Sequence, residues 1–295
     1  MPHDSAAQAH HHHAGAMSDG RLGLAIAVNI GLTVVQVAGG IVSGSLALIA
    51  DALHNFSDAA TLVIAWLARR IGRRPADASM TFGYARAEIV AALVNFTTLI
   101  LLGLFLAWQA VLRLLAPEPI EGWTVVIVAG VALAVDAATA FLTHAGAKHS
   151  MNIRAAFLHN LADALASVGV ILGGVVVLLY DWTLIDPILT LAIAGYSLWH
   201  GAREIGGAIR ILMLGVPDGM NPDEVISAMR AVAGVADVHH VHLWRLDERR
   251  SSLEAHLVLA EGAGALETKA AVRRLLRERF SVAHVTLETE RAGEA

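Results

Sequence analysis

Residues 87 to 115 read AEIVAALVNFTTLILLGLFLAWQAVLRLL, an apolar run whose only charges, Glu88 and Arg113, lie near its ends. A helix needs about 20 apolar residues to cross the hydrocarbon of a bilayer. This run is therefore long enough to form a transmembrane helix. The composition of the whole chain agrees, because 56% of its 295 residues are hydrophobic, 16% are charged, and the mean hydropathy is +0.59.

The same criterion, applied along the whole chain, identifies six candidate spans. They cover Leu22 to Val42, Ser45 to Leu67, Ala87 to Leu115, Trp123 to Ala147, Ala155 to Tyr180 and Ile185 to Ile205. We therefore predict an α-helical membrane protein with six transmembrane helices in residues 21–210. Residues 1–20 are polar and His-rich, without the apolar core of a cleavable signal peptide, and are predicted to be a disordered tail. Its run of histidines, His10 to His13, fits either a metal-collecting tail or the remnant of an expression tag.

Cationic residues gather on one side of these spans. They precede span one, fill the connection between spans two and three, and flank one end of spans four, five and six: Arg21, Arg69, Arg70, Arg73, Arg74, Arg86, Lys148, Arg154, Arg203 and Arg210. The loops on the other side are acidic and contain Glu118, Glu121 and Asp181. Because cationic loops stay in the cytoplasm, we predict a multi-pass protein of the cell (inner) membrane with both termini cytoplasmic.

Two of the spans contain the same pattern of polar residues. Span two contains His54-Asn55-Phe56-Ser57-Asp58-Ala59, and span five contains His159-Asn160-Leu161-Ala162-Asp163-Ala164. The four-residue interval places the His and the Asp of each motif on one face of a helix. An ionisable residue at the bilayer centre costs at least about 2.5–3.5 kcal/mol, so such residues usually mark ion paths.

Together the two motifs supply a complete set of metal ligands. Two imidazoles and two carboxylates suit tetrahedral zinc, and two carboxylates neutralise a dication in apolar surroundings. The two predicted helices run in opposite directions, as in an inverted repeat of three plus three spans with the site where the repeats meet. We predict that His54, Asp58, His159 and Asp163 bind Zn²⁺ and carry it across the membrane. The chain contains no cysteine, so any metal must be held by His, Asp or Glu.

Three further polar residues lie inside the predicted spans. Asp51 lies one turn before His54, where it is expected to act as a proton acceptor or as an outer partner of the metal ligands. Asp136 and Asn95 fit two roles equally well, as polar contacts between helices or as part of an ion path.

Beyond these motifs the chain resembles the cation diffusion facilitator family, and its zinc-transporting members in particular. The resemblance covers the chain from about residue 21 to residue 290. It implies a homodimer that exports a divalent cation in exchange for protons, and a His on both helices implies zinc or cadmium over manganese. Metal binding requires neutral imidazole and ionised carboxylate, so protons and metal compete for the same atoms. The residues that carry the resemblance are the paired His-x-x-x-Asp motifs, SLALIADA at 45–52, Phe82-Gly83-Tyr84 with Arg86 and Glu88, and Gly215-Val216-Pro217.

Residues 211–295 have the pattern of a separate, water-soluble domain. After Asn221 the periodicities predict helix, strand, strand, helix and strand. This order is similar to the ferredoxin-like α+β cytoplasmic domain of the same family, which implies dimerisation and metal sensing. So small a domain has little core of its own, which also favours a dimer. The predicted strands contain His239, His240, His242, His256 and His284.

The resemblance implies a metal site in this domain formed by His239, His256 and His284, although histidines on strands are also common as ordinary surface residues. The sequence departs from the family at two other places. Asp77 is retained between spans two and three, but Met80 and Tyr84 replace the expected histidines, so a metal site in that loop is not expected.

The family can also pair a cation at the position of Arg86 with an acidic residue after span six. Here Met213 and Leu214 occupy that stretch, which leaves the partner of Arg86 open.

Other functions fit part of the pattern. Cadmium, cobalt, nickel or iron can use the same ligands. A membrane-embedded metallohydrolase needs a vacant coordination position and a general base beside the metal, which these motifs do not provide, so the chain is not expected to be an enzyme. Metal sensing without transport would leave the motifs in the spans dispensable. A net charge of −5 without a basic stripe argues against nucleic acid as a partner.

Overall fold

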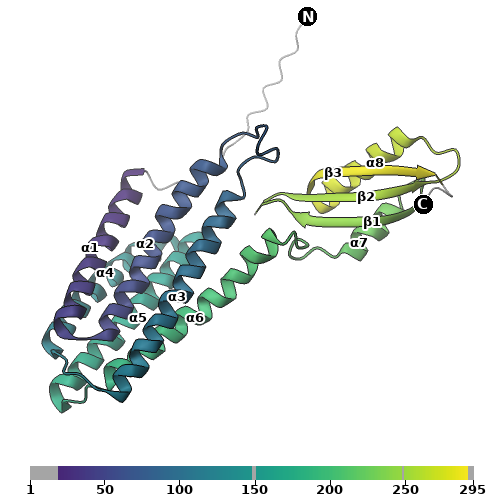
Figure 1. Ribbon diagram of the computed structural model, residues 1–295. Helices are drawn as coiled ribbons and strands as arrows, with labels where there is room; N and C mark the ends of the chain where they lie inside the picture. Colours follow the sequence, from purple (N-terminus) through teal and green to yellow (C-terminus); the bar gives the residue numbers. More distant parts are fainter. Residues whose placement is uncertain (1–18, 148–150, 248, 292–295) are drawn as a thin grey trace, which may run out of the picture. The chain divides into compact units, whose positions relative to one another are not determined.

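The computed structural model describes residues 19–147, 151–247 and 249–291. Within them, long helices are followed by a small domain of helices and strands (Figure 1). Each long helix overlaps one of the apolar runs, so the helical structure predicted for these runs is confirmed. Most of the predicted N-terminal tail, with His10 to His13, lies outside the described residues. The long helices are α1 (Asp19–Ser43), α2 (Leu46–Gly72), α3 (Ala87–Leu115), α4 (Gly122–Ala147), α5 (Met151–Tyr180) and α6 (Ile185–Leu212).

Among the described residues, three helices are both long and apolar enough to cross a membrane: Ala87–Leu115 in α3, Gly122–Phe141 in α4 and Asn160–Tyr180 in α5. The helix α1 contributes a shorter apolar stretch, Ala27–Ser43. The helix α2 carries the first His/Asp motif, and α6 carries charged residues toward both ends, which makes both less apolar. The helix α5 carries the second motif, and one of the three apolar stretches still includes its Asp163.

The chain divides into two compact units, the first of which comprises the described residues up to Ala59 together with Arg113–Leu189. In this unit α4 and α5 lie along each other, and α1 packs on α4. Glycine permits both close approaches. A Cβ atom at Gly174 would lie 2.9 Å from Val126 Cγ2, and one at Gly39 would lie 2.8 Å from Val128 Cγ2. Small residues at helix contacts are typical of membrane helices, whose association depends on close packing.

The second unit comprises Ala60–Leu112 and the described residues from Thr190 onward. Here α3 and α6 are in contact, and a Cβ atom at Gly201 would lie 2.9 Å from Ile100 Cγ1. The contact continues through an apolar cluster of Ile89, Ala208 and Ile211.

The small domain belongs to this second unit and has the predicted order of elements. They are α7 (Pro222–Arg230), β1 (Val235–Arg245), β2 (Ser251–Leu259), α8 (Ala265–Phe280) and β3 (Val282–Arg291). The strand order is β1-β2-β3, with β1 and β2 antiparallel and β2 and β3 parallel. A parallel pair needs a crossover, which α8 supplies. The two helices contact each other as well as the sheet, so they cover the same face.

Local sequence explains where α7 begins. The Asn221 side chain accepts a hydrogen bond from the backbone N–H of Asp223, and Pro222 occupies the first helical position of α7. Between the helices and the sheet lies a core of aliphatic side chains, among them Val225, Met229, Leu253, Leu257, Val272 and Leu276, all fully buried. The alternation of buried and exposed residues on β1 leaves its histidines on or near the open face of the sheet.

Candidate metal centres

The first candidate centre lies between α2 and α5, within the first unit. His54 and Asp58 come from α2 and Asp163 from α5, and one ligand atom from each lies within 4.8 Å of the others. His54 Nε2 is 3.8 Å from Asp58 Oδ2 and 3.5 Å from Asp163 Oδ1. A tetrahedral zinc ion with bonds of about 2.0–2.2 Å holds its ligand atoms about 3.3 Å apart. The three side chains are therefore close to the spacing that one ion requires.

His159, the fourth predicted ligand, lies on α5 one turn before Asp163. Its side chain is outside the described part of the structure. Because residues four apart share a helix face, the backbone places His159 on the face of α5 that carries Asp163. The structure thus brings together three of the predicted ligands and gives the helical position of the fourth.

The cluster is largely shielded from solvent. The side chains of His54 and Asp163 are 11% and 8% exposed, and that of Asp58 is 31% exposed. Uncompensated charge is costly in such surroundings, and a dication between two carboxylates is formally neutral. Asp58 is the most accessible of the three side chains, so solvent reaches the cluster at this residue.

A second layer of buried polar groups connects α1 to the same stretch of α2. The Gln36 side chain donates a hydrogen bond of 2.6 Å to Asp51 Oδ2 and accepts one of 3.1 Å from Asn55 Nδ2. All three residues are buried, with Gln36 fully so. Asp51, predicted as an outer partner or proton acceptor, therefore has a fixed neighbour on α1. Gln36 was not predicted, although a glutamine inside an apolar run was a signal that could have identified it.

The other two polar residues predicted inside the spans are also buried. The Ser167 hydroxyl on α5 donates a 3.4 Å hydrogen bond to Asp136 Oδ2 on α4, so these side chains join two helices of the first unit. Asn95 is buried on α3, in the second unit. The geometry of Asp136 fits the interpretation as a polar contact between helices.

The beginning of α2 is held by a carboxylate that the sequence did not identify. Asp186, at the start of α6, accepts hydrogen bonds from the Ser45 hydroxyl and from the backbone N–H groups of Leu46 (2.7 Å) and Ala47 (3.3 Å). These N–H groups have no partner within the helix, and a carboxylate also suits the positive end of the helix dipole. The carbonyl of Gly44 accepts a further bond of 2.7 Å from Arg113. The helix that carries His54 is therefore anchored at its first turn.

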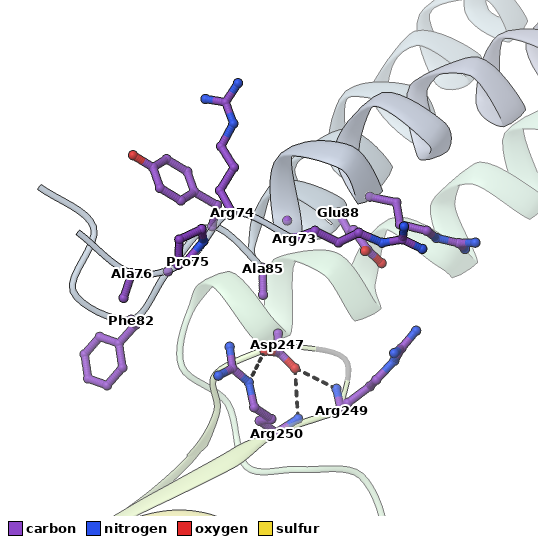
Figure 2. Close-up of a pocket in the computed structure, with 14 residues that line it drawn as sticks. Arg73, Arg74, Pro75, Ala76, Phe82, Ala85, Glu88, Asp247, Arg249 and Arg250 are labelled. Atoms are coloured by element: carbon purple, nitrogen blue, oxygen red, sulfur yellow. Dashed lines mark hydrogen bonds and ion pairs between the residues drawn. The ribbon is translucent and has the colours of Figure 1, made fainter. Parts of the chain in front are cut away.

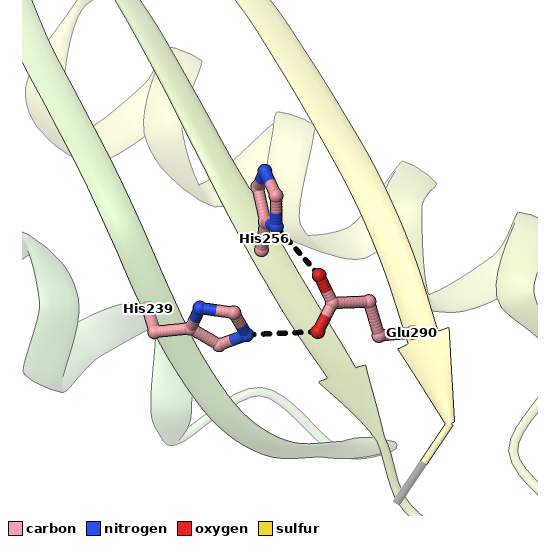
Figure 3. Close-up of side chains that lie close together, drawn as sticks. All are labelled: His239, His256 and Glu290. Atoms are coloured by element: carbon pink, nitrogen blue, oxygen red, sulfur yellow. Dashed lines mark hydrogen bonds and ion pairs between the residues drawn. The ribbon is translucent and has the colours of Figure 1, made fainter. Parts of the chain in front are cut away.

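The second candidate centre lies on the sheet of the small domain (Figure 3). His239 on β1 and His256 on β2 are paired in the antiparallel register, and Glu290 on β3 reaches both. His239 Nε2 lies 2.9 Å from Glu290 Oε2, and His256 Nδ1 lies 2.5 Å from Glu290 Oε1. The hydrogen bond from His256, and to a smaller extent the one from His239, lowers the pKa of Glu290, so its carboxylate stays ionised.

His284, predicted as the third ligand here, does not join this cluster. The parallel register pairs His256 with Glu288 and Ser252 with His284, which sets His284 four residues, about 13 Å, along the strand. Its ring contacts Phe82 instead, with 5.7 Å between centroids. Glu290 takes the place predicted for His284, and only the strand register could have identified it.

An irregularity in β1 brings another histidine to the cluster. The register shifts between His239 and His242, and His240 has a positive φ of 50°. Such a bulge lets neighbouring residues of one strand approach the same face. The ring of His240 lies 4.8 Å from that of His256 and 4.8 Å from that of His242, measured between centroids.

The loop between α2 and α3 uses its retained aspartate for internal hydrogen bonds. Ser79 donates to Asp77 through its hydroxyl and its backbone N–H, and Tyr84 donates at 2.6 Å. These bonds, of which the one from the Ser79 hydroxyl has the largest effect, hold the pKa of Asp77 well below its usual range.

The sequence left the partner of Arg86 open. In the structure, Arg86 donates a hydrogen bond through Nε to the carbonyl oxygen of Leu246 at 2.9 Å.

Long apolar helices with a buried His/Asp cluster, followed by a small α+β domain, define a class of membrane proteins with metal-ligating groups among their helices. Comparison with protein families identifies the chain more closely. Residues 22–213 match the cation efflux transmembrane domain, and residues 217–292 match the cytoplasmic domain of cation efflux proteins. The chain belongs to the cation efflux family, which confirms the resemblance to the cation diffusion facilitators.

Curated relatives match nearly the whole chain. A zinc transporter called ZitB from Pectobacterium atrosepticum is 35% identical over 286 residues, covering 96% of this chain and 89% of its own. The metal cation efflux system protein CzcD from Cupriavidus metallidurans is 32% identical over 283 residues, with coverages of 96% and 89%. A cadmium, cobalt and zinc/H⁺-K⁺ antiporter from Bacillus velezensis is 29% identical over 287 residues, with coverages of 96% and 92%.

Proposed function

We propose that this protein exports a divalent metal ion, zinc before others, across the cell membrane in exchange for protons. The observation that carries the proposal is the convergence of His54, Asp58 and Asp163 from two helices on one point. His159, one turn from Asp163, is proposed as the fourth ligand. Four protein ligands leave no coordination position for a catalytic water, so the site suits carriage of the ion and not hydrolysis.

Proton exchange follows from the same atoms. Metal binding requires ionised Asp58 and Asp163 and a neutral imidazole at His54, so protons that arrive on these groups displace the ion. An imidazole with an ordinary pKa near 6.5 changes charge close to physiological pH. A site that faces a more acidic compartment releases metal, and the protonated site returns. Asp51, held by Gln36 beside the cluster, is proposed as an outer partner that accepts a proton or orients the ligands.

The membrane arrangement is proposed from the cationic loops and the helix lengths. We propose six spans in residues 21–210, a tail at 1–20, and a cytoplasmic domain at 211–295, with both termini cytoplasmic. The six long helices have 25 to 30 residues each, more than the roughly 20 needed to cross the bilayer. The small domain is proposed to join two copies into a homodimer, because a domain of its size has little core of its own.

The preference for zinc rests on ligand chemistry and on the names of the relatives. Two imidazoles and two carboxylates suit tetrahedral zinc, and relatives named for zinc, cadmium and cobalt share 29–35% of their residues with this chain. Affinity order alone does not select among these metals. Zinc, cadmium, cobalt, nickel and iron are therefore to be compared directly.

The test is metal uptake into proteoliposomes that contain the full-length protein under an imposed proton gradient. We expect His54→Ala and Asp58→Asn to abolish zinc flux, and protons to move opposite to zinc in the parent protein. Asp181→Asn is the matched control for Asp58→Asn. It makes the same change at an exposed position whose φ of 50° an asparagine tolerates.

Flux equal to that of the parent in Asp58→Asn would refute the membrane site. Equal loss in Asp181→Asn would show that the change acts through something other than this cluster. Zinc flux without any counterflow of protons would refute the exchange while leaving the site intact.

We further propose that His239, His256 and Glu290 hold a metal ion in the cytoplasmic domain. Two imidazoles and one ionised carboxylate converge there, and partial exposure leaves room for a water or a fourth side chain. The test is zinc titration of the full-length protein in detergent by calorimetry. Relative to the parent, His256→Ala is expected to lose one binding event and to keep transport, whereas His284→Ala keeps that event.

A further inference from the structure

Two adjoining hollows in the second unit fit the two halves of a lipid molecule. The first has a volume of about 620 Å³ and lies among the end of α2, the α2–α3 loop and the turn between β1 and β2 (Figure 2). Its described charged lining residues are five arginines and two carboxylates: Arg69, Arg73, Arg74, Arg249, Arg250, Glu88 and Asp247. The balance of charge favours an anion.

Internal pairing accounts for part of this charge and leaves the rest available. Asp247 accepts hydrogen bonds from the backbone N–H groups of Arg249 and Arg250 and from Arg250 Nε, at 2.6–2.9 Å. Partial burial would raise the pKa of Asp247, but these hydrogen bonds outweigh it and lower the pKa, so Asp247 stays ionised and neutralises Arg250. Within the described residues, Arg69, Arg73 and Arg249 have no ion-pair partner, and all three are exposed.

The neighbouring hollow is apolar and has a volume of about 810 Å³. Phe82, Gly83 and Tyr84 line both hollows, so the two adjoin at these residues. Its other walls are mostly aliphatic and aromatic side chains from α2, α3 and the end of β1, including Ile64, Leu67, Ile71, Val90, Trp244 and Leu246. An inorganic anion has no apolar surface to bury in such a groove, whereas an acyl chain is stabilised when the groove removes it from water.

Aromatic residues indicate that the basic hollow lies at the depth of lipid headgroups. Trp66 on α2 is exposed, and the guanidinium of Arg70, four residues later, lies 5.8 Å from its ring centroid. The same pair recurs on α6, where Arg203 lies 5.6 Å from Trp199. Tryptophans gather at the membrane interface, and cationic side chains beside them reach the headgroups. Arg69 and Arg73 follow within two turns of Trp66.

We propose that this protein binds an anionic phospholipid, with the phosphate among Arg69, Arg73 and Arg249 and an acyl chain in the adjoining apolar groove. Guanidinium groups bind phosphate oxygens through paired hydrogen bonds, and basic pockets at this membrane face attract anionic headgroups. Because the hollow is lined both by the end of α2 and by the domain that matches the family's cytoplasmic domain, the lipid would come from the cytoplasmic leaflet. It would bridge a membrane helix and that domain.

The test counts lipids retained by the full-length protein in native mass spectrometry, with no metal present, so that it is independent of transport. The probes are phosphatidylglycerol, phosphatidylcholine with the same acyl chains, and inorganic phosphate. We expect the parent to retain phosphatidylglycerol in preference to phosphatidylcholine. Retention of phosphatidylglycerol should fall about fivefold for each arginine removed. The single variant Arg249→Gln tests the loss of one arginine, and the double variant Arg73→Gln/Arg249→Gln tests the loss of two.

The matched control is Arg273→Gln/Arg274→Gln, which removes the same charge from exposed positions on α8, outside both hollows. Should the double pocket variant fail to fold, the single variants Arg73→Gln and Arg249→Gln give the same comparison. Equal retention of the two lipids, or equal loss in the α8 control, would overturn the proposal. Displacement of the lipid by inorganic phosphate at equal concentration would overturn the lipid as the ligand.

Discussion

The two clusters of histidine and carboxylate in this protein share their chemistry and differ in their surroundings. His54 and Asp163, between the helices α2 and α5, are 11% and 8% exposed, whereas His239 and Glu290, on the sheet, are 38% and 16% exposed. The helical cluster contains two carboxylates and the sheet cluster one. In a site shielded from water, two carboxylates are needed to neutralise a dication. At a solvent-exposed site, one carboxylate is enough, because water stabilises the remaining charge.

This difference separates the functions that we propose for the two clusters. An ion at the helical cluster is neutralised by protein groups, so it can be held inside the bilayer and then displaced by protons on the same groups. An ion at the sheet cluster stays next to solvent and links three strands. Transport should therefore depend on the first cluster, and the second should respond to metal without carrying it.

The largest effect is expected from Asp163→Asn, which keeps the shape of the side chain and removes its charge. We expect zinc flux in proteoliposomes to fall at least about 100-fold, since losing even an outer partner of a metal ligand costs about 10–100-fold. The matched change is Asp136→Asn, another buried carboxylate in the same unit that bonds Ser167. If Asp136→Asn stops flux as completely, the contrast between ligands and helix contacts fails.

The next largest effect should come from Gln36→Leu. This change removes the donor to Asp51 and the acceptor for Asn55, and it leaves buried polar groups without their partner at a cost of about 1–3 kcal/mol. We expect roughly tenfold slower zinc flux, since outer partners orient metal ligands. Thr33→Val is the control, because the Thr33 hydroxyl bonds only the carbonyl of Asn29 within its own helix among the described contacts. Unchanged flux in Gln36→Leu would show that the connection between α1 and α2 does not support the site.

The contrast between clusters also explains what could be predicted from the sequence. His54 and Asp58 were identifiable because a four-residue interval on a helix fixes a common face, whatever else the chain does. Glu290 was not identifiable, because the neighbours of a residue on a strand depend on the strand register. In that register His284 pairs with Ser252, four residues before His256. A glutamine inside an apolar run could have drawn attention to Gln36, but its partners Asp51 and Asn55 lie on the next helix and follow from no local pattern. Asp186 contacts the start of α2 from about 140 residues along the chain, which no local pattern encodes either.

A smaller and more local effect is expected from Glu290→Gln. In an Asp163→Asn background, which disables the helical cluster, equilibrium dialysis should show zinc affinity about 10–100-fold lower when Glu290 is also changed. In the otherwise native chain, the same substitution should leave zinc flux within about twofold of the parent. Glu288→Gln is the control, since its carboxylate is 68% exposed and lies 3.5 Å from His256 Nε2. A large loss of flux in Glu290→Gln would mean that the sheet cluster takes part in transport.

The smallest effect concerns stability at acid pH without metal. Because hydrogen bonds from His256 and His239 lower the pKa of Glu290 in the folded protein, its contribution is complete above the unfolded value of about 4.3. It is lost as the pH falls through the lowered folded value. Hydrogen–deuterium exchange of β1 and β3 amides in the full-length protein, corrected for intrinsic rates, should show protection declining over that window. Glu290→Gln should flatten the decline and Glu288→Gln should not, because only Glu290 gains both histidine bonds. An identical decline in all three proteins would mean that these bonds do not stabilise the sheet.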